Sequence, residues 1–202
     1  YTENVRPGND IIKITEKIIE YKTPLLYYKF NKPKNVICSL QDPKDRNDLK
    51  PYLKHLPVSL FPIGRLDRNT KGLLLFTNDG NFAQKILHPK YKIHKTYRII
   101  LDKPLTKNHL NRILQGIILE DGPVEFSNLI FISKKEFILS IQEGRNRIVR
   151  RTFEHLGYQI ITLKRIAIGT LQLGKLQEGK FQKLTSRQIN SALSINLSDL
   201  NL

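Results

Sequence analysis

One short stretch, residues 64–80, constrains the fold more than any other part of the chain. It reads GRLDRNTKGLLLFTNDG, and the apolar run at residues 73–76 is too hydrophobic to lie on a surface. A run of this length between turn-forming residues is typical of a buried strand. The run ends at the turn formers of residues 78–80, and apolar residues at helical spacing follow until Pro89. The stretch therefore predicts a core strand that leads into a helix.

The loop before this strand carries an aspartate, Asp67, between basic and polar neighbours. A carboxylate held rigidly at the entrance of a core strand is well placed for catalysis. The alternative is a turn residue that bonds its own backbone. Asp79, at the other end of the strand, fits that second description, and we expect it to be structural.

The rest of the chain mixes strands with short helices and contains no repeats. Residues 27–31 alternate as in a strand with one buried face, and alternation returns at residues 137–141. We expect one helix capped by Thr106 and another that begins near Asn146. Strands that dominate, with helices placed irregularly between them, indicate an α+β fold more than a doubly wound parallel sheet.

The charge balance points to a polyanionic partner. The chain has 34 Lys+Arg against 18 Asp+Glu, a formal charge of +16, and the excess is spread along its length. We favour nucleic acid over a membrane surface because no long apolar segment is present. Solubility alone is the alternative explanation of the charge.

Cysteine and histidine usage argues against a metal site. Cys38 is the single cysteine, which excludes an internal disulfide and a cysteine-based zinc cluster and fits a reducing compartment. The five histidines show no i, i+4 pair, so we expect no metal. The chain begins at Tyr1 and contains no methionine, so we expect a fragment of a longer product, from which a targeting peptide could have been lost.

Several further segments occur in a characteristic order along the chain. They are NKPKNVICS at residues 31–39, the block at 64–80, HKTYRI at 94–99, LEDG at 119–122, EGRNRIVRR at 143–151 and LKRIAIGTLQLGKL from Leu163. Together they resemble the signature of the pseudouridine synthases, in particular the RsuA/RluB branch that modifies ribosomal RNA. The resemblance extends from about Tyr28 to Leu184, which is most of the chain.

The resemblance implies a particular α+β architecture, a mixed and largely antiparallel central sheet in two halves with flanking helices and a central cleft. It assigns residues 23–185 to the catalytic domain. Residues 1–22 resemble the closing strands of a small RNA-binding module, and an edge hairpin of the main domain is the alternative. Residues 186–202 form a C-terminal tail. Thr185, just before it, and Gln188 have the spacing of a capping box for a short helix.

The resemblance also implies the catalytic groups, which are Asp67, Tyr97 and Arg150. Burial favours the neutral form of a carboxyl group, and an arginine within about 4 to 6 Å restores the ionised form, which is the role implied for Arg150 beside Asp67. Tyr97 would stack on the target base and is a candidate to remove its carbon 5 proton. Without the resemblance, Arg150 would be interpreted as a surface arginine, and Tyr97 as a core tyrosine.

Candidate RNA contacts lie around these groups. They are Arg65, Lys32, Arg145, Arg147 and Arg151, with Lys95 as a weaker candidate. For Arg145, Arg147 and Arg151, solvated charges on a helix are an equally good interpretation. The chain departs from the family pattern at Asn35, where glycine is common, and at Ile148 and Gln188.

We therefore expect a monomeric enzyme that isomerises a uridine of ribosomal RNA without a cofactor, on a nucleotide flipped out of its stack. Within the branch, LEDG and EGRNR resemble more closely the enzymes that act on large-subunit RNA. The alternatives are the same reaction on small-subunit RNA and a catalytically idle RNA-binding or ribosome-assembly protein. No membrane partner is expected. The compartment would be the cytoplasm, or an organelle stroma or matrix if a targeting peptide has been removed.

Overall fold

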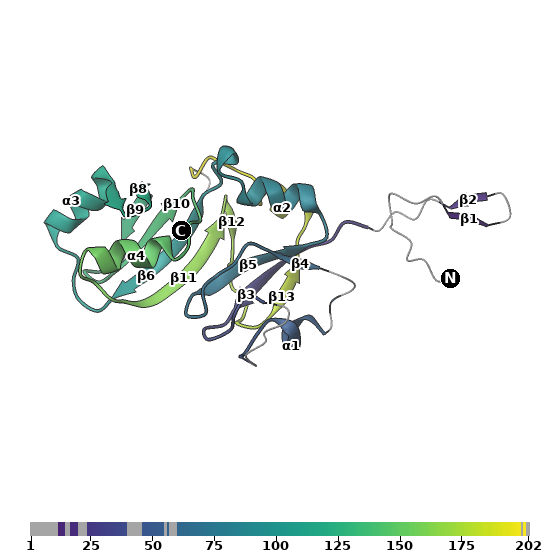
Figure 1. Cartoon of the computed structure of the whole chain (residues 1–202), viewed down its shortest axis with the longest axis horizontal. Helices are drawn as coiled ribbons and strands as arrows, with labels where there is room; N and C mark the ends of the chain where they lie inside the picture. The colour runs from purple at the N-terminus through teal and green to yellow at the C-terminus, as the bar shows by residue number, and fades with distance from the viewer. Residues whose placement is uncertain are drawn as a thin grey trace.

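The structure is a computed structural model that describes residues 24–39, 46–54, 56, 60–198 and 200, and the backbone of residues 12–14 and 17–19. A nine-stranded sheet forms its centre, in the order β13-β3-β5-β11-β6-β10-β9, with β4 on β5 and β12 on β11 (Figure 1). The strands are β3 (Tyr27–Lys32), β4 (Phe61–Ile63), β5 (Lys71–Thr77), β6 (Lys95–Leu101), β9 (Ser127–Phe131), β10 (Glu136–Ile141), β11 (Ile160–Ile168), β12 (Leu171–Gln172) and β13 (Phe181–Lys183).

Smaller elements surround this sheet. The helices are α1 (Lys50–Leu53), α2 (Gly80–Leu87), the 3₁₀ turn η1 (Pro89–Tyr91), α3 (Lys107–Gln115), α4 (Ile148–His155) and α5 (Ser186–Ala192). Two antiparallel pairs form separate two-stranded sheets, β7 (Ile117–Leu119) with β8 (Gly122–Val124) and β1 (Ile12–Ile14) with β2 (Lys17–Ile19). The expectation of an RNA-binding module falls largely on residues outside the described ranges and stays a prediction.

The two halves of the sheet meet at its one parallel pair, β5 with β11. The ladder there is short and pairs Lys71 with Lys164 and Gly72 with Arg165. Gly72 has a φ of +106°, and a Cβ at this position would lie 2.2 Å from the carbonyl oxygen of Arg165. Only glycine therefore lets the two halves approach. The predicted α+β fold, with a mixed, largely antiparallel sheet in two halves, is confirmed.

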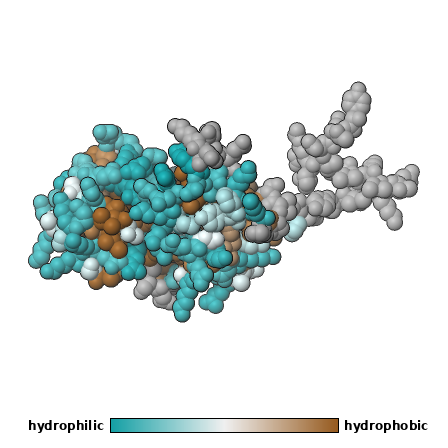
Figure 2. Space-filling view, turned by 90° about the horizontal axis from the view of Figure 1, so that it is seen from below, coloured by the Kyte–Doolittle hydropathy of each residue, from teal (hydrophilic) through white to brown (hydrophobic). Residues whose placement is uncertain are grey.

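Hydrophobic clusters hold helices against each half. Ile99, Leu139 and Phe153 belong to the cluster beneath α4. Leu75 and Phe82 belong to the cluster between β5 and α2. The described surface in Figure 2 is mostly hydrophilic with small apolar patches, as the strong net charge leads one to expect.

The prediction of one buried face for residues 27–31 is wrong. Phe30 is fully buried on one side of β3, and Lys29 and Asn31 are also buried, at 5% and 2% exposure. The polar side chains are tolerated there because they reach backbone carbonyls. Lys29 Nζ donates to the oxygens of Gln172 and Leu173, at 3.1 Å each.

The helix boundaries follow local capping chemistry. Asp79 accepts hydrogen bonds from two backbone N–H groups at the start of α2, which confirms its structural role. Thr106 caps α3, as predicted. The α4 helix begins at Ile148, slightly later than predicted, because Arg147 has a left-handed backbone with a φ of 49°.

The C-terminal residues are anchored to the main sheet. Thr185 and Gln188 form the predicted capping box at the start of α5. The backbone N–H of Thr170 donates to the oxygen of Ser191 at 2.9 Å, and Ala192 is fully buried. No described helix is both long and apolar enough to cross a bilayer.

Candidate active site

A cleft of about 710 Å³ opens where the two halves of the sheet meet. Its walls come from the loop between β4 and β5, the end of α2, strands β6 and β11, and residues 143–150. Asp67, Tyr97 and Arg150 all line it. The structure thus brings together the residues that the family resemblance selected from three distant segments.

The loop that carries Asp67 is held rigidly by backbone contacts. The N–H of Thr70 donates to the oxygen of Asp67 at 2.9 Å and closes the turn. The N–H of Asn35, in a left-handed conformation with a φ of 66°, donates to the oxygen of Arg68 at 2.8 Å. Asn35 can replace the glycine common in the family because asparagine tolerates this backbone. The side chain of Asp67 is 31% exposed, which leaves the carboxylate accessible from the cleft.

Arg150 lies against this loop from the other side of the cleft. Its Nη2 donates to the oxygen of Asn69 at 2.9 Å, and its Nε lies 4.0 Å from Oδ2 of Asp67, the outer limit of an ion pair. The residue is 8% exposed, so the interpretation as a surface arginine is wrong. The loop that follows Asp67 covers the side of the helix that carries Arg150.

The guanidinium of Arg150 has unused hydrogen-bonding capacity. Its Nε is buried and has no hydrogen-bond partner. Burial lowers the pKa of Arg150, yet a guanidinium remains protonated in proteins. The result is a fixed positive charge beside Asp67 with a donor still available.

Tyr97 lies at the seam between two hydrophobic clusters. It is half-buried, packs against the cluster beneath α4 and also against the cluster that contains Leu66 and Phe30. It pairs with Arg165 across the β6–β11 ladder. The ring is therefore held in place by the core while it also lines the cleft.

Two further cations form part of the cleft, and the sequence interpretation missed one and underrated the other. Lys95 is 8% exposed and Arg165 is 6% exposed. Burial, with the charge of Arg165 as a second cause, lowers the pKa of Lys95 to about 8. The position of Lys95 two residues before Tyr97 on one strand was a signal available in the sequence. For Arg165, the only signal in the sequence is its position in the LKRIAIG segment.

Lys32 is not a surface contact for RNA, and this prediction is corrected. The residue is fully buried, and its Nζ donates to the oxygens of Val36 at 2.6 Å and Pro33 at 2.9 Å. Burial lowers its pKa to about 8. The weaker contact with the oxygen of Arg68, at 3.5 Å, places this amine beneath the Asp67 loop as a support.

Two of the other predicted RNA contacts are exposed at the mouth of the cleft. Arg65 and Arg147 both line it and are exposed. Arg147 donates to Glu154 at 2.9 Å, with both side chains largely in solvent. An exposed pair of this kind is weak, so Arg147 remains available to another anion.

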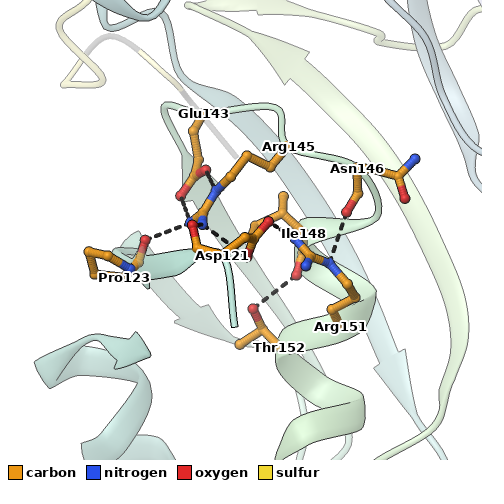
Figure 3. A network of polar contacts seen from close by, with 8 residues as sticks. All are labelled: Asp121, Pro123, Glu143, Arg145, Asn146, Ile148, Arg151 and Thr152. Atoms are coloured by element: carbon orange, nitrogen blue, oxygen red, sulfur yellow. Dashed lines mark hydrogen bonds and ion pairs between the residues drawn. The ribbon is translucent and has the colours of Figure 1, made fainter. Parts of the chain in front are cut away.

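Arg145 and Arg151 have internal partners instead (Figure 3). Arg151 donates to Asp121 at 2.6 Å, and that hydrogen bond lowers the pKa of Asp121. Arg145 also donates to Asp121, to the oxygen of Pro123 and to Glu143. We call these five residues the rim network, although Pro123 contributes only its backbone. The network ties the β7–β8 turn to the segment that enters α4, so neither arginine is a free surface charge.

No group of His, Cys, Asp or Glu side chains in the described part of the chain could hold a metal ion. The cleft instead combines an accessible carboxylate, an aromatic ring and several buried cations. Such a site can attack an electrophilic carbon, support a flat ring and stabilise negative charge.

Comparisons with known proteins agree with this chemistry. The profile of a family described as RNA pseudouridylate synthase matches residues 27–155. The chain is 40% identical over 188 residues to the ribosomal large subunit pseudouridine synthase B of Bacillus subtilis, which covers 90% of this chain and 77% of that protein. It is 37% identical to the protein of the same name from Pseudomonas aeruginosa, over 69% of this chain and 38% of that protein.

A solved structure has the same fold. The crystal structure of a pseudouridylate synthase matches with a TM-score of 0.79 and 30% identity, over 94% of this chain and 83% of the other. The profile match contains Asp67, Tyr97 and Arg150 within its bounds. The chain therefore belongs to the RNA pseudouridine synthase family, as its motifs indicated.

Proposed function

We propose that this enzyme converts a uridine of large-subunit ribosomal RNA into pseudouridine, with Asp67 as nucleophile and without a cofactor. The observation that carries the proposal is the position of Asp67, accessible in the cleft and 4.0 Å from the buried guanidinium of Arg150. Arg150 places a fixed positive charge beside the carboxylate that we propose as the nucleophile. Sequence relatives that carry the name of large-subunit enzymes support the choice of RNA.

The reaction breaks one bond to the sugar and forms another. An oxygen of Asp67 bonds to carbon 1′ as the bond from carbon 1′ to N1 of uracil breaks. The base then rotates, carbon 5 bonds to carbon 1′ and releases the carboxylate, and the proton on carbon 5 is lost. Tyr97 supplies a face on which the base stacks and is the candidate for removing this proton. Stacking of a base on an aromatic ring contributes roughly 1 to 3 kcal/mol.

The target nucleotide must leave its stack to reach the cleft, at a cost of a few kcal/mol. Basic side chains at the mouth of the cleft offset that cost by binding phosphates. Arg65 and Arg147 are exposed there and are the contacts we propose. We propose that the protein acts as a monomer wherever the ribosomes that contain its substrate are made, in the cytoplasm or in an organelle stroma or matrix.

Release of tritium tests the chemistry. Ribosomal RNA labelled at carbon 5 of uridine should lose tritium to water with the wild-type protein, because the carbon 5 hydrogen is replaced by the bond to the sugar. Asp67→Asn should abolish release while its RNA affinity stays close to that of the wild type. Asp102→Asn is the matched control, since Asp102 is exposed and accepts from the N–H of Gln159, which an asparagine oxygen can also do. Equal release by wild type and Asp67→Asn would refute the proposed nucleophile.

A map of pseudouridines in ribosomal RNA tests the target. Cells that lack the protein should lose one or more sites in large-subunit RNA, and the wild-type gene should restore them. Loss confined to small-subunit RNA would favour the alternative substrate. An unchanged map, together with no tritium release by the purified protein, would favour an idle RNA-binding protein.

A further inference from the structure

The floor of the cleft carries two buried cations on the same side of the sheet as Tyr97. Lys95 and Tyr97 are two residues apart on β6, so their side chains lie on one face. Tyr97 pairs with Arg165 in the antiparallel β6–β11 ladder, which places Arg165 on that face as well. Both cations line the cleft and are more than nine-tenths buried.

Among the residues that the structure describes, no carboxylate is paired with either cation. Lys95 Nζ has one contact of 3.3 Å, with the oxygen of Gln142. Arg165 donates through Nε to the oxygen of Leu73 at 2.7 Å, while its buried Nη2 has no hydrogen-bond partner. Neither residue forms an ion pair with any other residue that the structure describes.

The carboxylates of the cleft are bound elsewhere. The ion-pair partner of Asp67 is Arg150, at 4.0 Å, and the partner of Glu143 is Arg145. A buried positive charge without a counter-charge is unfavourable, and a buried donor without an acceptor adds to the penalty. Lys95 and Arg165 therefore form a site prepared for negative charge that the protein itself does not supply.

We propose that Lys95 and Arg165 stabilise the uracil of the target nucleotide while it is detached from its sugar. This rests on the proposed function. When the bond from carbon 1′ to N1 breaks, its electron pair leaves with the base, and the negative charge spreads over the ring nitrogen and the carbonyl oxygens. The ammonium of Lys95 and the guanidinium of Arg165 belong to the lining of the cleft in which that charge would develop. The electron pair is returned when carbon 5 bonds to carbon 1′, so neither cation has to gain or lose a proton.

The position of the pair favours the base over a phosphate. Lys95 and Arg165 lie deep in the cleft and flank the strand position of Tyr97, on which the base is proposed to stack. The phosphates belong to the backbone of the RNA, whose contacts we place on the exposed arginines at the mouth. Charge stabilisation by groups already fixed in place is a large contribution in many enzymes.

Substitution of each cation by methionine tests the proposal. Lys95→Met and Arg165→Met keep most of the apolar stem, and each should lower the single-turnover rate by about 100-fold to 1,000-fold. The RNA dissociation constant should stay within about threefold of the wild-type value. Lys29→Met is the matched control, because Lys29 is a lysine buried to a similar extent and bonded to carbonyls outside the cleft. The folded fraction of Lys29→Met should convert the RNA at the wild-type single-turnover rate.

A more acidic leaving base separates charge stabilisation from a general disturbance of the cleft. RNA that carries 5-fluorouridine at the target releases a base in which fluorine already stabilises negative charge. The rate deficit of Lys95→Met, measured as loss of the starting nucleoside, should be smaller on this RNA than on normal RNA. Lys95→Met removes a buried charge and should therefore fold. The test with this variant stays valid even if Arg165→Met does not fold.

The outcomes distinguish this inference from the proposed function. An active wild type with unchanged rates in both variants overturns the inference and leaves the proposed function intact. Weaker binding with an unchanged rate and a smaller salt dependence identifies a phosphate contact and also overturns it. An equal deficit on normal and fluorinated RNA overturns charge stabilisation of the base. A wild type without activity on any uridine refutes the proposed function itself.

Discussion

The buried arginines of the cleft and the arginines of the rim network have opposite surroundings. Arg150 and Arg165 are buried, and each has a guanidinium nitrogen without a hydrogen-bond partner. Arg145 and Arg151 are about 30% exposed, and both are paired with carboxylates. Arg150 and Arg151 are adjacent in the sequence, yet one faces the loop of Asp67 and the other faces the β7–β8 turn.

This contrast separates groups kept available for a ligand from groups that hold the framework. A buried donor without a partner is costly in the free protein, so its persistence at the cleft indicates that a substrate provides the partner. A paired arginine in partial contact with solvent contributes little to stability and stays where its carboxylates hold it. The short segment of residues 145–151 therefore contains an arginine kept available for a ligand, Arg150, and arginines that hold the framework, Arg145 and Arg151.

Among the tests of this comparison, the largest effect is expected from Arg150, one of the two buried arginines. Arg150→Met removes the cation beside Asp67 and should lower the single-turnover rate by about 100-fold to 1,000-fold. Arg150→Lys keeps a charge but not the planar fork and should recover part of the rate. Quench-flow measurement at saturating RNA provides the rates. If the single-turnover rate of Arg150→Met is within about twofold of the wild-type rate, the buried arginines do not differ in function from those of the rim network.

The pH dependence of stability tests whether the charge on the floor is uncompensated. The pKa of Lys95 is lowered to about 8 by burial and by Arg165, so between about pH 8 and pH 10 the unfolded chain binds more protons than the folded protein. The unfolding free energy should therefore rise with pH in this window, by up to about 1.4 kcal/mol per pH unit for this group. Lys95→Met should show a smaller rise in urea unfolding at pH 8, 9 and 10.

The comparison between wild type and Lys95→Met cancels the other groups that titrate nearby. Lys32 also has a pKa lowered to about 8 and adds to the rise in both proteins. The raised pKa of Cys38 opposes it, and that of Tyr27, raised to about 12, opposes it above pH 10. Identical slopes in the two proteins would mean that the amine of Lys95 is compensated after all.

A smaller effect is expected from the rim network. Asp121→Ala removes the carboxylate shared by Arg145 and Arg151 and should lower stability only slightly, because both ion pairs are in contact with solvent. Turnover should stay close to the wild-type value, and RNA binding should tighten slightly because the arginines are released. Thermal unfolding and a binding isotherm measure the two effects. A loss of turnover as large as that of Arg150→Met would make the rim network part of the catalytic machinery.

The smallest effect is expected from Arg147, the exposed arginine at the mouth of the cleft. Arg147→Ala should weaken RNA binding at low salt and reduce the slope of log K against log salt by roughly 0.7 to 0.9, as for one phosphate contact. Turnover at saturating RNA should not change. Filter binding at several salt concentrations measures the slope, and an unaltered slope would assign Arg147 to its pair with Glu154 alone.

The local elements were largely predictable because their causes are local. The β5 strand and α2 follow from an apolar run and a capping aspartate, and Thr106 and Thr185 cap α3 and α5 as expected. The motif resemblance selects Asp67, Tyr97 and Arg150, and the structure brings them to one cleft.

The errors concern residues whose surroundings come from distant parts of the chain. The sequence makes Lys32 a candidate RNA contact, but the segment up to Val36 and the loop after Asp67 enclose its amine. The partners of Arg145 include Asp121, which is 24 positions away. Arg165 carried no local signal, since only its pairing with Tyr97 reveals that it belongs to the cleft.

By itself, the amino-acid order determined the strands, the helix ends, the basic charge and the family, because turn chemistry, periodicity and motifs are read over short spans. Only the folded arrangement decided which of the many cations are buried, paired or open to a substrate. Burial and pairing depend on what covers a side chain in space. Arg150 and Arg165, for example, are covered by backbone from the other half of the sheet, at Asn69 and Leu73.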